Sequence, residues 1–483
     1  MSTAIYESEP NGKRKSSSSR RPAVVLIAVI LLLVLAPVGW LVLTLQTARP
    51  APDPSHEAAL RELARSQQRD PAAPNRHGDL VAAIDRYHEE RAKIAERVIE
   101  EGRRKHPNNT ARPYHINLDA LINHPDYPDE QHAFEVEDAK TVIADVHARN
   151  LTAPIFEILR HPNLANDYRP SSPHPTRYTP INARDINEWQ DLRTLAGEQR
   201  IMIRLALDEG DLDIAIQLLL DSASIPPVIT RQATILEHLI GFSSSRIVLE
   251  DAVRIATHAG IDAEALVAIS EATQIASDLG DFTAAIRSEQ HYYADVLDAM
   301  HTSDGRLLPS AGWYHYSDYT VYEVPDRRQS PSFMEKLEDI SGFFAPTKDD
   351  NLNVLRGAIP LLLPAATSPD PSVRQSAIKD CERYLAVHGD QAPVMAESVK
   401  MLVGVIDLHW QLQRDITSTD VLLAMAAYRL DNGDWPESIE ALIPAYLDEH
   451  PTDPVTGEPL EYRHEPGTPP SLESFGSESA SGR

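Results

Sequence analysis

Cysteine is nearly absent from this chain of 483 residues, in which Cys381 is the single one. One cysteine cannot form a disulfide within its own chain, so no disulfide framework supports the fold. Ile378 lies three residues before Cys381 and Leu385 four residues after it, which is the spacing of one apolar helix face. We therefore predict that Cys381 is a buried, small apolar side chain and not a nucleophile.

Positive charge is also scarce. Lys and Arg number 45 against 72 Asp and Glu, which gives a net charge of −27 at pH 7. A charge of this sign and size repels the phosphate backbone of nucleic acids and anionic lipid surfaces. The composition thus excludes nucleic acid as an expected partner.

The signature motifs of common enzymes are missing. The sequence has no H-E-x-x-H, no G-x-S-x-G, no Walker A motif and no G-x-G-x-x-G. His56 and His88 each precede a glutamate but lack a second histidine at the spacing of a zinc site. Acidic pairs such as Asp349-Asp350 are typical of a solvated surface. We therefore expect no cofactor and assign no catalytic residue.

One long apolar run is present, from Ala23 to Leu45, and no charged side chain interrupts it. At about 1.5 Å per residue, roughly 20 apolar residues in a helix span the ~30 Å hydrocarbon core of a bilayer. A cleaved signal peptide is the alternative, but Pro37, Val38 and Gly39 follow the first apolar part without an A-x-A cleavage pattern. The sequence predicts an uncleaved anchor over residues 22–46, with membrane lipid as its partner.

The orientation of this anchor follows from the residues on either side. Basic residues gather in residues 1–21, whereas the chain after the run becomes mixed and then acidic. The positive-inside rule therefore predicts a cytoplasmic amino terminus and a main domain on the periplasmic side of a cell membrane that the chain crosses once. The predicted organisation is a basic tail (1–21), an anchor (22–46), a spacer (47–75), a helical domain (76–417, with a possible sub-boundary at 301–331), a distinct segment (418–466) and a flexible tail (467–483).

The helical domain is predicted from apolar residues at helical spacing and from the scarcity of strand patterns. Within it, Gly210-Asp211 and Gly280-Asp281 introduce similar phrases 70 residues apart, about twice the ~34-residue period of tetratricopeptide-type hairpins. In such a phrase the glycine ends one helix in the left-handed conformation and the aspartate caps the next helix. The predicted fold class is mainly α, either as a degenerate tetratricopeptide-like hairpin array or as a plain antiparallel bundle.

Individual helices are predicted as follows, with Pro360 and Pro364 expected to end the helix that contains them. The ranges are Asp79–Arg104, Phe134–Ala148, Ala153–Arg160, a nearly continuous stretch over Asp185–Met300, Phe333–Phe344, Asn351–Leu363, Ser372–His388 and Ala392–Arg414. Near His56–Gln68 the chain has a short helical pattern, but we interpret these residues as part of the spacer.

Residues 312–322 form the densest aromatic run in the chain. Large rings with polar tips are suited to line a binding cleft, because the rings supply contact area and the tips supply orientation. A loop that closes one end of the helical layer explains the same residues. The candidate binding residues are Trp313, Tyr314, His315, Tyr316, Asp318, Tyr319 and Tyr322.

The carboxyl-terminal segment carries two specific patterns. Gly433 to Leu442 reads G-x-W-P-x-S-I-x-x-L, and Asp453 to Tyr462 reads D-P-x-x-G-x-P-x-x-Y. These patterns resemble the soluble part of type II secretion pseudopilins, which implies a small α+β tail. In that family the terminal loop holds calcium. Here Glu478 stands where an aspartate is expected and further ligands are missing, so Glu478 is only a weak metal candidate.

Taken together, the anchor, the helical body and the tail over residues 420–480 resemble a group of uncharacterised bacterial single-anchor membrane proteins, a resemblance that carries no known activity. Helical hairpins offer extended surfaces for proteins or peptides. We therefore expect a membrane-tethered extracytoplasmic interaction or scaffold protein with a protein or peptide partner. The alternatives are a membrane-anchored hydrolase with its site at 312–322 and an accessory of a secretion or pilus-like assembly.

Overall fold

The computed structural model describes residues 53–105, 133–166, 168, 187–301, 303–305, 346–463 and 471–472. The anchor predicted for residues 22–46 and the helix predicted for Phe333–Phe344 lie outside these residues. Within them the protein is mainly α-helical, as the sequence predicts, and the named strands are the two-residue pair β1 (Tyr462–Arg463) and β2 (Ser471–Leu472).

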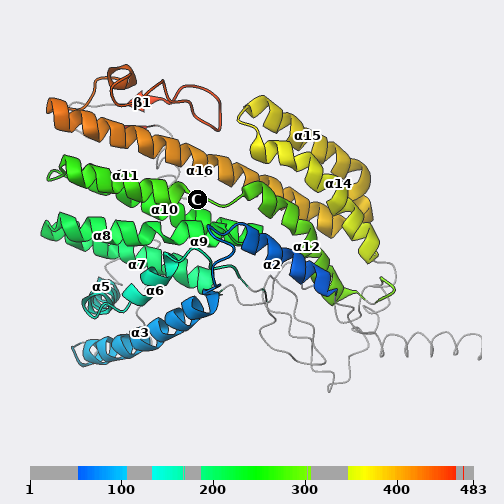
Figure 1. Ribbon diagram of the computed structural model, residues 1–483, viewed down its shortest axis with the longest axis horizontal. Helices are drawn as coiled ribbons and strands as arrows, with labels where there is room; N and C mark the ends of the chain where they lie inside the picture. Colours follow the sequence, from blue (N-terminus) through cyan, green and yellow to red (C-terminus); the bar gives the residue numbers. More distant parts are fainter. Residues whose placement is uncertain are drawn as a thin grey trace, which may run out of the picture.

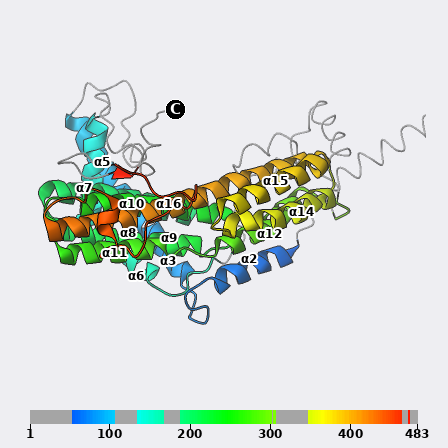
Figure 2. The same ribbon diagram turned by 90° about the horizontal axis from the view of Figure 1, so that it is seen from above.

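The molecule is elongated, and its helices lie in layers along the long axis (Figures 1 and 2). At one end, α7, α8, α10 and α11 lie side by side and pack on one another, with α3, α5 and α6 beneath them (Figure 1). Their bounds are α3 (His77–Lys105), α5 (Ala133–Ala148), α6 (Ala153–Leu159), α7 (Asn187–Glu209), α8 (Leu212–Ala223), α9 (Ile225–Thr230), α10 (Ile235–Ala256) and α11 (Ala263–Ser277).

The other end is built by α12 (Phe282–Met300), α14 (Lys348–Thr367) and α15 (Pro371–His388). Helix α2 (Pro54–Ser66) lies in the predicted spacer but packs against α12, and its Leu60 and Ala64 are fully buried. The 40-residue helix α16 (Pro393–Asn432) runs along the molecule and contacts α10, α11 and α14, so it connects both ends (Figure 2).

The Gly-Asp phrases form helix junctions, each in its own way. Gly210 has φ +77°, and the Asp211 carboxylate accepts a hydrogen bond from Ile214 N, so this copy ends α7 and caps α8 as predicted. Asp281 likewise caps α12, but Gly280 has no positive φ. Gly280 is required there because a Cβ would lie 2.1 Å from the carbonyl oxygen of Thr230.

Helix α14 corrects one prediction. Pro360 and Pro364 lie inside it and do not end it, and the helix continues to Thr367. Both prolines are on the exposed side, whereas Leu355, Ile359 and Leu362 on the other side are buried in the core shared with α12 and α16. Packing of this apolar face offsets the hydrogen bonds that the prolines cannot donate. Helix α16 also extends beyond the predicted Arg414 and passes position 417 without a break.

One described stretch, Leu212–Thr230 in α8 and α9, is long and apolar enough to cross a membrane. Its Leu219, Ile225 and Ile229 have no exposed surface, and α8 packs against α7, α10 and α11. This stretch is therefore part of the hydrophobic core of the helical layers. Cys381 is also buried, as predicted, and burial raises the pKa of its thiol to about 11.

The tail is attached to the helical body. After Gly433, whose φ is +81°, the chain forms a short 3-10 helix, η6 (Ile439–Leu442), and a turn at Asp453 to Gly457. The Arg374 guanidinium on α15 donates to the carbonyl oxygens of Pro454 at 2.6 Å and Val455 at 2.8 Å. The same group lies 4.1 Å from the ring centroid of Trp410 on α16. One arginine thus joins the tail to two helices.

Candidate functional site

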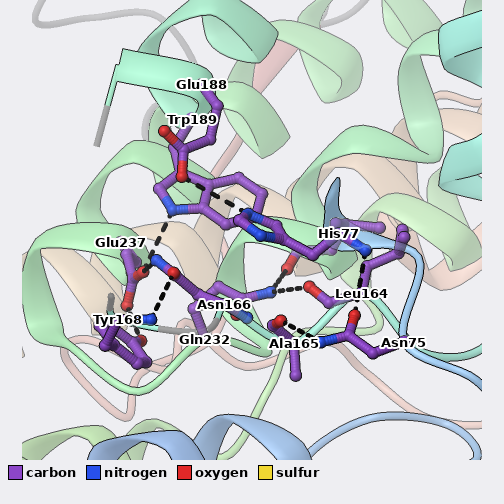
Figure 3. A network of polar contacts seen from close by, with 11 residues as sticks. Asn75, His77, Leu164, Ala165, Asn166, Tyr168, Glu188, Trp189, Gln232 and Glu237 are labelled. Atoms are coloured by element: carbon purple, nitrogen blue, oxygen red, sulfur yellow. Dashed lines mark hydrogen bonds and ion pairs between the residues drawn. The ribbon is translucent and has the colours of Figure 1, made fainter. Parts of the chain in front are cut away.

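The residues that the sequence singles out as a site are not placed by the structure. All lie outside the described residues: Trp313, Tyr314, His315, Tyr316, Asp318, Tyr319, Tyr322 and the weak metal candidate Glu478. Among the described residues, a network of polar contacts surrounds Glu237, where α3, α7, α10 and the chain after α6 meet (Figure 3).

Glu237 is in the first turn of α10 and has no exposed surface. Thr234 is the N-cap of this helix, and its backbone N and its Oγ1 each donate to Glu237 Oε2 at 2.9 Å. Glu237 N in turn donates to Thr234 Oγ1 at 3.4 Å. The two residues form a capping box, which satisfies backbone donors that a helix start leaves without partners.

Three further side chains donate to the same carboxylate from outside α10. Tyr168 donates its hydroxyl to Oε2 at 2.6 Å, Trp189 donates Nε1 to Oε1 at 3.1 Å, and Asn166 donates Nδ2 to Oε1 at 3.2 Å (Figure 3). Trp189 is in α7 and the other two follow α6. Glu237 therefore accepts five hydrogen bonds and joins three separate segments of the chain.

Tyr168 shows how strictly this arrangement fixes the backbone. Its φ is +46°, in the left-handed region that costs an L-residue roughly 1–2 kcal/mol. Its backbone N donates to Asn166 Oδ1 at 2.9 Å, and its hydroxyl also accepts from Ala233 N at 2.7 Å. These bonds and the bond to Glu237 hold the residue in an otherwise unfavourable conformation.

Amide side chains extend the network to the chain before α3; Gln232 is fully buried, whereas Asn75 is exposed. Gln232 Oε1 accepts from Asn166 N at 2.8 Å, and its Nε2 donates to the carbonyl oxygen of Leu164 at 3.2 Å. Asn75 Nδ2 donates to the carbonyl oxygen of Ala165 at 2.8 Å. The chain after α6 is thus held from both sides by groups that carry no charge.

His77, the first residue of α3, contributes the remaining contact. Its Nε2 lies 3.5 Å from Glu188 Oε1, and its ring centroid lies 5.3 Å from that of Trp189 (Figure 3). Both partners belong to α7, so this histidine joins α3 to α7 next to Glu237.

The electrostatics of the network match a structural role. Burial raises the pKa of Glu237, and the hydrogen bonds from Tyr168 and Thr234 oppose that shift by favouring the ionised form. Burial and the negative charge of Glu237 hold the pKa of Tyr168 well above its usual value. Two carboxylate oxygens offer about four lone-pair sites, and five donors occupy them here. All five donors come from the protein itself, so this carboxylate fixes the helices and the segment that supply them.

A second buried acid, Glu289, belongs to α12 but contacts the first residue of α10. Glu289 of α12 accepts a hydrogen bond from Ile235 N at 2.9 Å and is 3% exposed. Burial, assisted by the negative charge of Glu237, raises the pKa of Glu289 to about 8. Glu289 is therefore protonated at neutral pH.

Ion pairs connect successive helices of the layers. Arg91 of α3 lies 2.5 Å from Glu198 of α7. Arg200 of α7 lies 3.2 Å from Asp251 of α10, and Arg246 of α10 lies 2.7 Å from Asp415 of α16. Burial raises the pKa of Asp251 to about 6 despite the neighbouring Arg200. Each of these helix contacts thus contains at least one ion pair, and Arg200 also pairs with Glu250 of α10 at 2.8 Å.

His238 is fully buried and His409 is half-buried, and both rings contact Phe242 and Phe282. The His409 ring stacks on Phe282 at 4.3 Å between centroids, and both Phe242 and Phe282 contact His238. Burial lowers the pKa of His238 to about 3 and that of His409 to about 4, so both rings are neutral. In the part of the chain that the structure describes, no group of three or more His, Cys, Asp or Glu side chains is arranged to hold a metal ion.

The sequence contains one local signal for this network, the capping-box pattern Thr234-x-x-Glu237. No local signal marks Asn166 and Tyr168 as partners of Glu237, because these two residues lie in a proline-rich stretch without periodicity. Their contacts with Glu237 span about 70 residues of sequence and come from tertiary folding alone.

Comparisons with known proteins returned no relative: no protein-family model matches the chain, and neither does any curated protein or solved structure. The resemblance of residues 418–466 to pseudopilins therefore stays a prediction from the sequence.

Proposed function

We propose that the protein is a membrane-tethered scaffold, whose helical body binds another protein on the extracytoplasmic side. The observation that carries this proposal is the use of the buried polar groups. Glu237 has all its acceptor sites occupied by protein donors, and Arg91, Arg200 and Arg246 each pair with an acid on a neighbouring helix. Groups of this kind fix the relative positions of helices, which is what a binding surface spread over several helices needs.

The expected partner has a basic surface. The net charge of −27 favours a positively charged protein, because complementary potentials speed association and exclude other partners. The anchor over residues 22–46 would hold the body near the membrane, and a degenerate tetratricopeptide-like arrangement of the hairpins would provide the extended surface.

The test is crosslinking of the full-length chain in its native membrane. A zero-length reagent that joins carboxyl groups to lysines suits an acidic protein with a basic partner. We expect one protein to be recovered reproducibly through acidic residues of 76–417, and its recovery to fall as salt is raised before crosslinking. Recovery of crosslinks only within the chain itself, at both low and high salt, would refute the proposal.

A role beside a secretion or pilus-like assembly predicts a different pattern in the same experiment. Its crosslinks would come from residues 434–463, in the tail that Arg374 attaches to the body. A deletion that tests this idea should begin after Gly433, because Val421 and Met425 of α16 are buried and a cut at 417 would remove them.

A further inference from the structure

Helix α2 is attached to the body in different ways at its two ends. At the carboxyl-terminal end, Gln67 Oε1 accepts from Asp281 N at 2.9 Å, and Gln67 Nε2 donates to the carbonyl oxygen of Gln232 at 3.2 Å. Between pH 5 and 8 none of these groups gains or loses a proton. This end of α2 is therefore insensitive to pH.

At the amino-terminal end the contacts are made by groups that titrate. His56 Nδ1 lies 3.4 Å from Nδ1 of His291 on α12, within hydrogen-bond distance. Such a bond requires that one ring nitrogen donates and the other accepts, so at least one of the two rings must be neutral. The two ring centroids are 5.7 Å apart.

Asp298 of α12 is a neighbour of His56 and is 1% exposed. Its Oδ2 accepts from Asp53 N at 2.9 Å and lies 3.8 Å from His56 Nε2, while Lys348 of α14 pairs with its Oδ1. The carboxylate therefore has partners whether or not His56 is charged, and it does not depend on protonation of that ring.

The charged groups that face His56 are Asp53, which is the N-cap of α2, Asp298 on α12, and Lys348 and Arg356 on α14. Burial lowers the pKa of His56; the acids Asp298 and Asp53 oppose this shift, and the two basic groups add to it. Burial also lowers the pKa of His291, and the charge of His56 lowers it further. Both rings are thus neutral in the folded protein at neutral pH.

We propose that the contact between His56 and His291 is a pH-sensitive latch, which holds the amino-terminal turns of α2 on α12 at neutral pH and releases them in acid. When both rings are protonated, neither nitrogen can accept, and two positive charges face each other at a distance made for a hydrogen bond. The unfolded chain binds these protons more readily than the folded protein does, so the attachment weakens as the pH falls below the ordinary histidine pKa of about 6.5.

The latch lies close in sequence to the predicted anchor and to the predicted aromatic site. Asp53 is the first described residue after the predicted anchor, and His56 follows three residues later. His301 and Lys348 lie on either side of the segment that contains the predicted aromatic site. Release of α2 would therefore change how the body is connected to whatever precedes residue 53.

The test is amide hydrogen exchange of the full-length chain in detergent at pH 7.5 and pH 5.5, corrected for the intrinsic effect of pH. In the native chain we expect protection over residues 54–60 to be lost at pH 5.5, while α16 keeps its protection. The double variant His56→Gln, His291→Gln contains no titrating ring, so its protection over 54–60 should be the same at both pH values. His258→Gln, a change at a histidine outside this contact, should behave as the native chain does.

Equal protection of residues 54–60 at both pH values in the native chain would overturn the proposal, and so would a loss in the double variant as large as in the native chain. Should the double variant fail to fold, exchange of the histidine C2 hydrogens in the native chain decides the matter. His56 and His291 must then both titrate below pH 6.5, and titration of either at or above that value would overturn the latch.

Discussion

Glu198, Asp251 and Glu289 are carboxyl groups with at most 3% exposure, and each contacts a group on a neighbouring helix. Burial raises the pKa of all three. In an uncharacterised cleft such shifts point to catalysis, but here the shifted groups face protein donors and not an open surface. At the scale of single residues, these buried carboxyl groups serve to fix helices.

Glu237→Gln tests this interpretation directly. In glutamine an amide nitrogen, which is itself a donor, replaces one carboxylate oxygen. Because both oxygens of Glu237 accept from donors, this nitrogen would face donors in either orientation, and we expect a loss of about 2–4 kcal/mol in the free energy of unfolding. Chemical denaturation followed by tryptophan fluorescence, to which buried Trp189 contributes, measures this loss. The control is Glu250→Gln on the same helix, where a 56% exposed side chain pairs with Arg200 and the loss should stay below about 1 kcal/mol. Equal losses in the two variants would contradict the assignment.

Glu289→Gln should stabilise the fold, and the gain in stability should grow as the pH rises. Folded Glu289 keeps its proton up to about pH 8, whereas the unfolded chain releases it near 4.5, so this residue lowers stability as the pH rises between these values. We expect the variant to be more stable than the native chain by about 1–3 kcal/mol at pH 7.5. Denaturation at several pH values should show the difference shrinking toward pH 4.5; a difference independent of pH would argue against a protonated Glu289.

At the scale of elements, the sequence predicts most helices well because apolar spacing and caps are local signals. The predictions for 79–104, 134–148 and 372–388 each agree with a helix to within two residues at either end. The errors occur where tertiary packing overrides a local signal. Pro360 and Pro364 stay inside α14 because its other face is buried, and Gly280 is set by its approach to Thr230 and not by a left-handed turn.

The two glycines of the repeated phrase should therefore respond differently to the same change. Gly210→Ala places a Cβ in open space at φ +77° and should cost about 1–2 kcal/mol. Gly280→Ala places a Cβ 2.1 Å from a backbone oxygen and should cost more, about 3 kcal/mol, because the backbone must move. Thermal unfolding of both variants measures the order, and a larger loss for Gly210→Ala would be inconsistent with the packing of α12 on the α9–α10 turn.

Attachment of the tail is tested at Arg374. Lysine cannot reproduce the fork that reaches Pro454 and Val455, so Arg374→Lys should increase amide exchange over residues 453–463 while α15 keeps its protection. Arg383→Lys is the matched control, because that side chain is 75% exposed and pairs with Asp380 within the same helix. An increase of the same size in both variants would mean that Arg374 does not hold the tail.

At the scale of the whole molecule, the sequence predicts the helical class and the buried position of Cys381, and both are confirmed. The network around Glu237 could not be predicted, since its donors come from residues 166, 168 and 189, which no local pattern connects. The anchor over 22–46, the aromatic site at 312–322 and the pseudopilin-like origin of the tail stay predictions. The proposed function rests on the first of them, an anchor that holds the body outside the cytoplasm.

Labelling with a membrane-impermeant maleimide tests that premise most directly. Cys381 is buried and burial raises the pKa of its thiol to about 11, so the native chain should not react and serves as the control. Two single additions report the two sides, Ser16→Cys before the predicted anchor and Ala386→Cys on the exposed face of α15.

In intact spheroplasts we expect Ala386→Cys to be labelled and Ser16→Cys to react only after lysis, with both chains in the membrane fraction. Protection of Ala386→Cys until lysis, or recovery of the chain in the soluble fraction, would contradict a tethered extracytoplasmic scaffold.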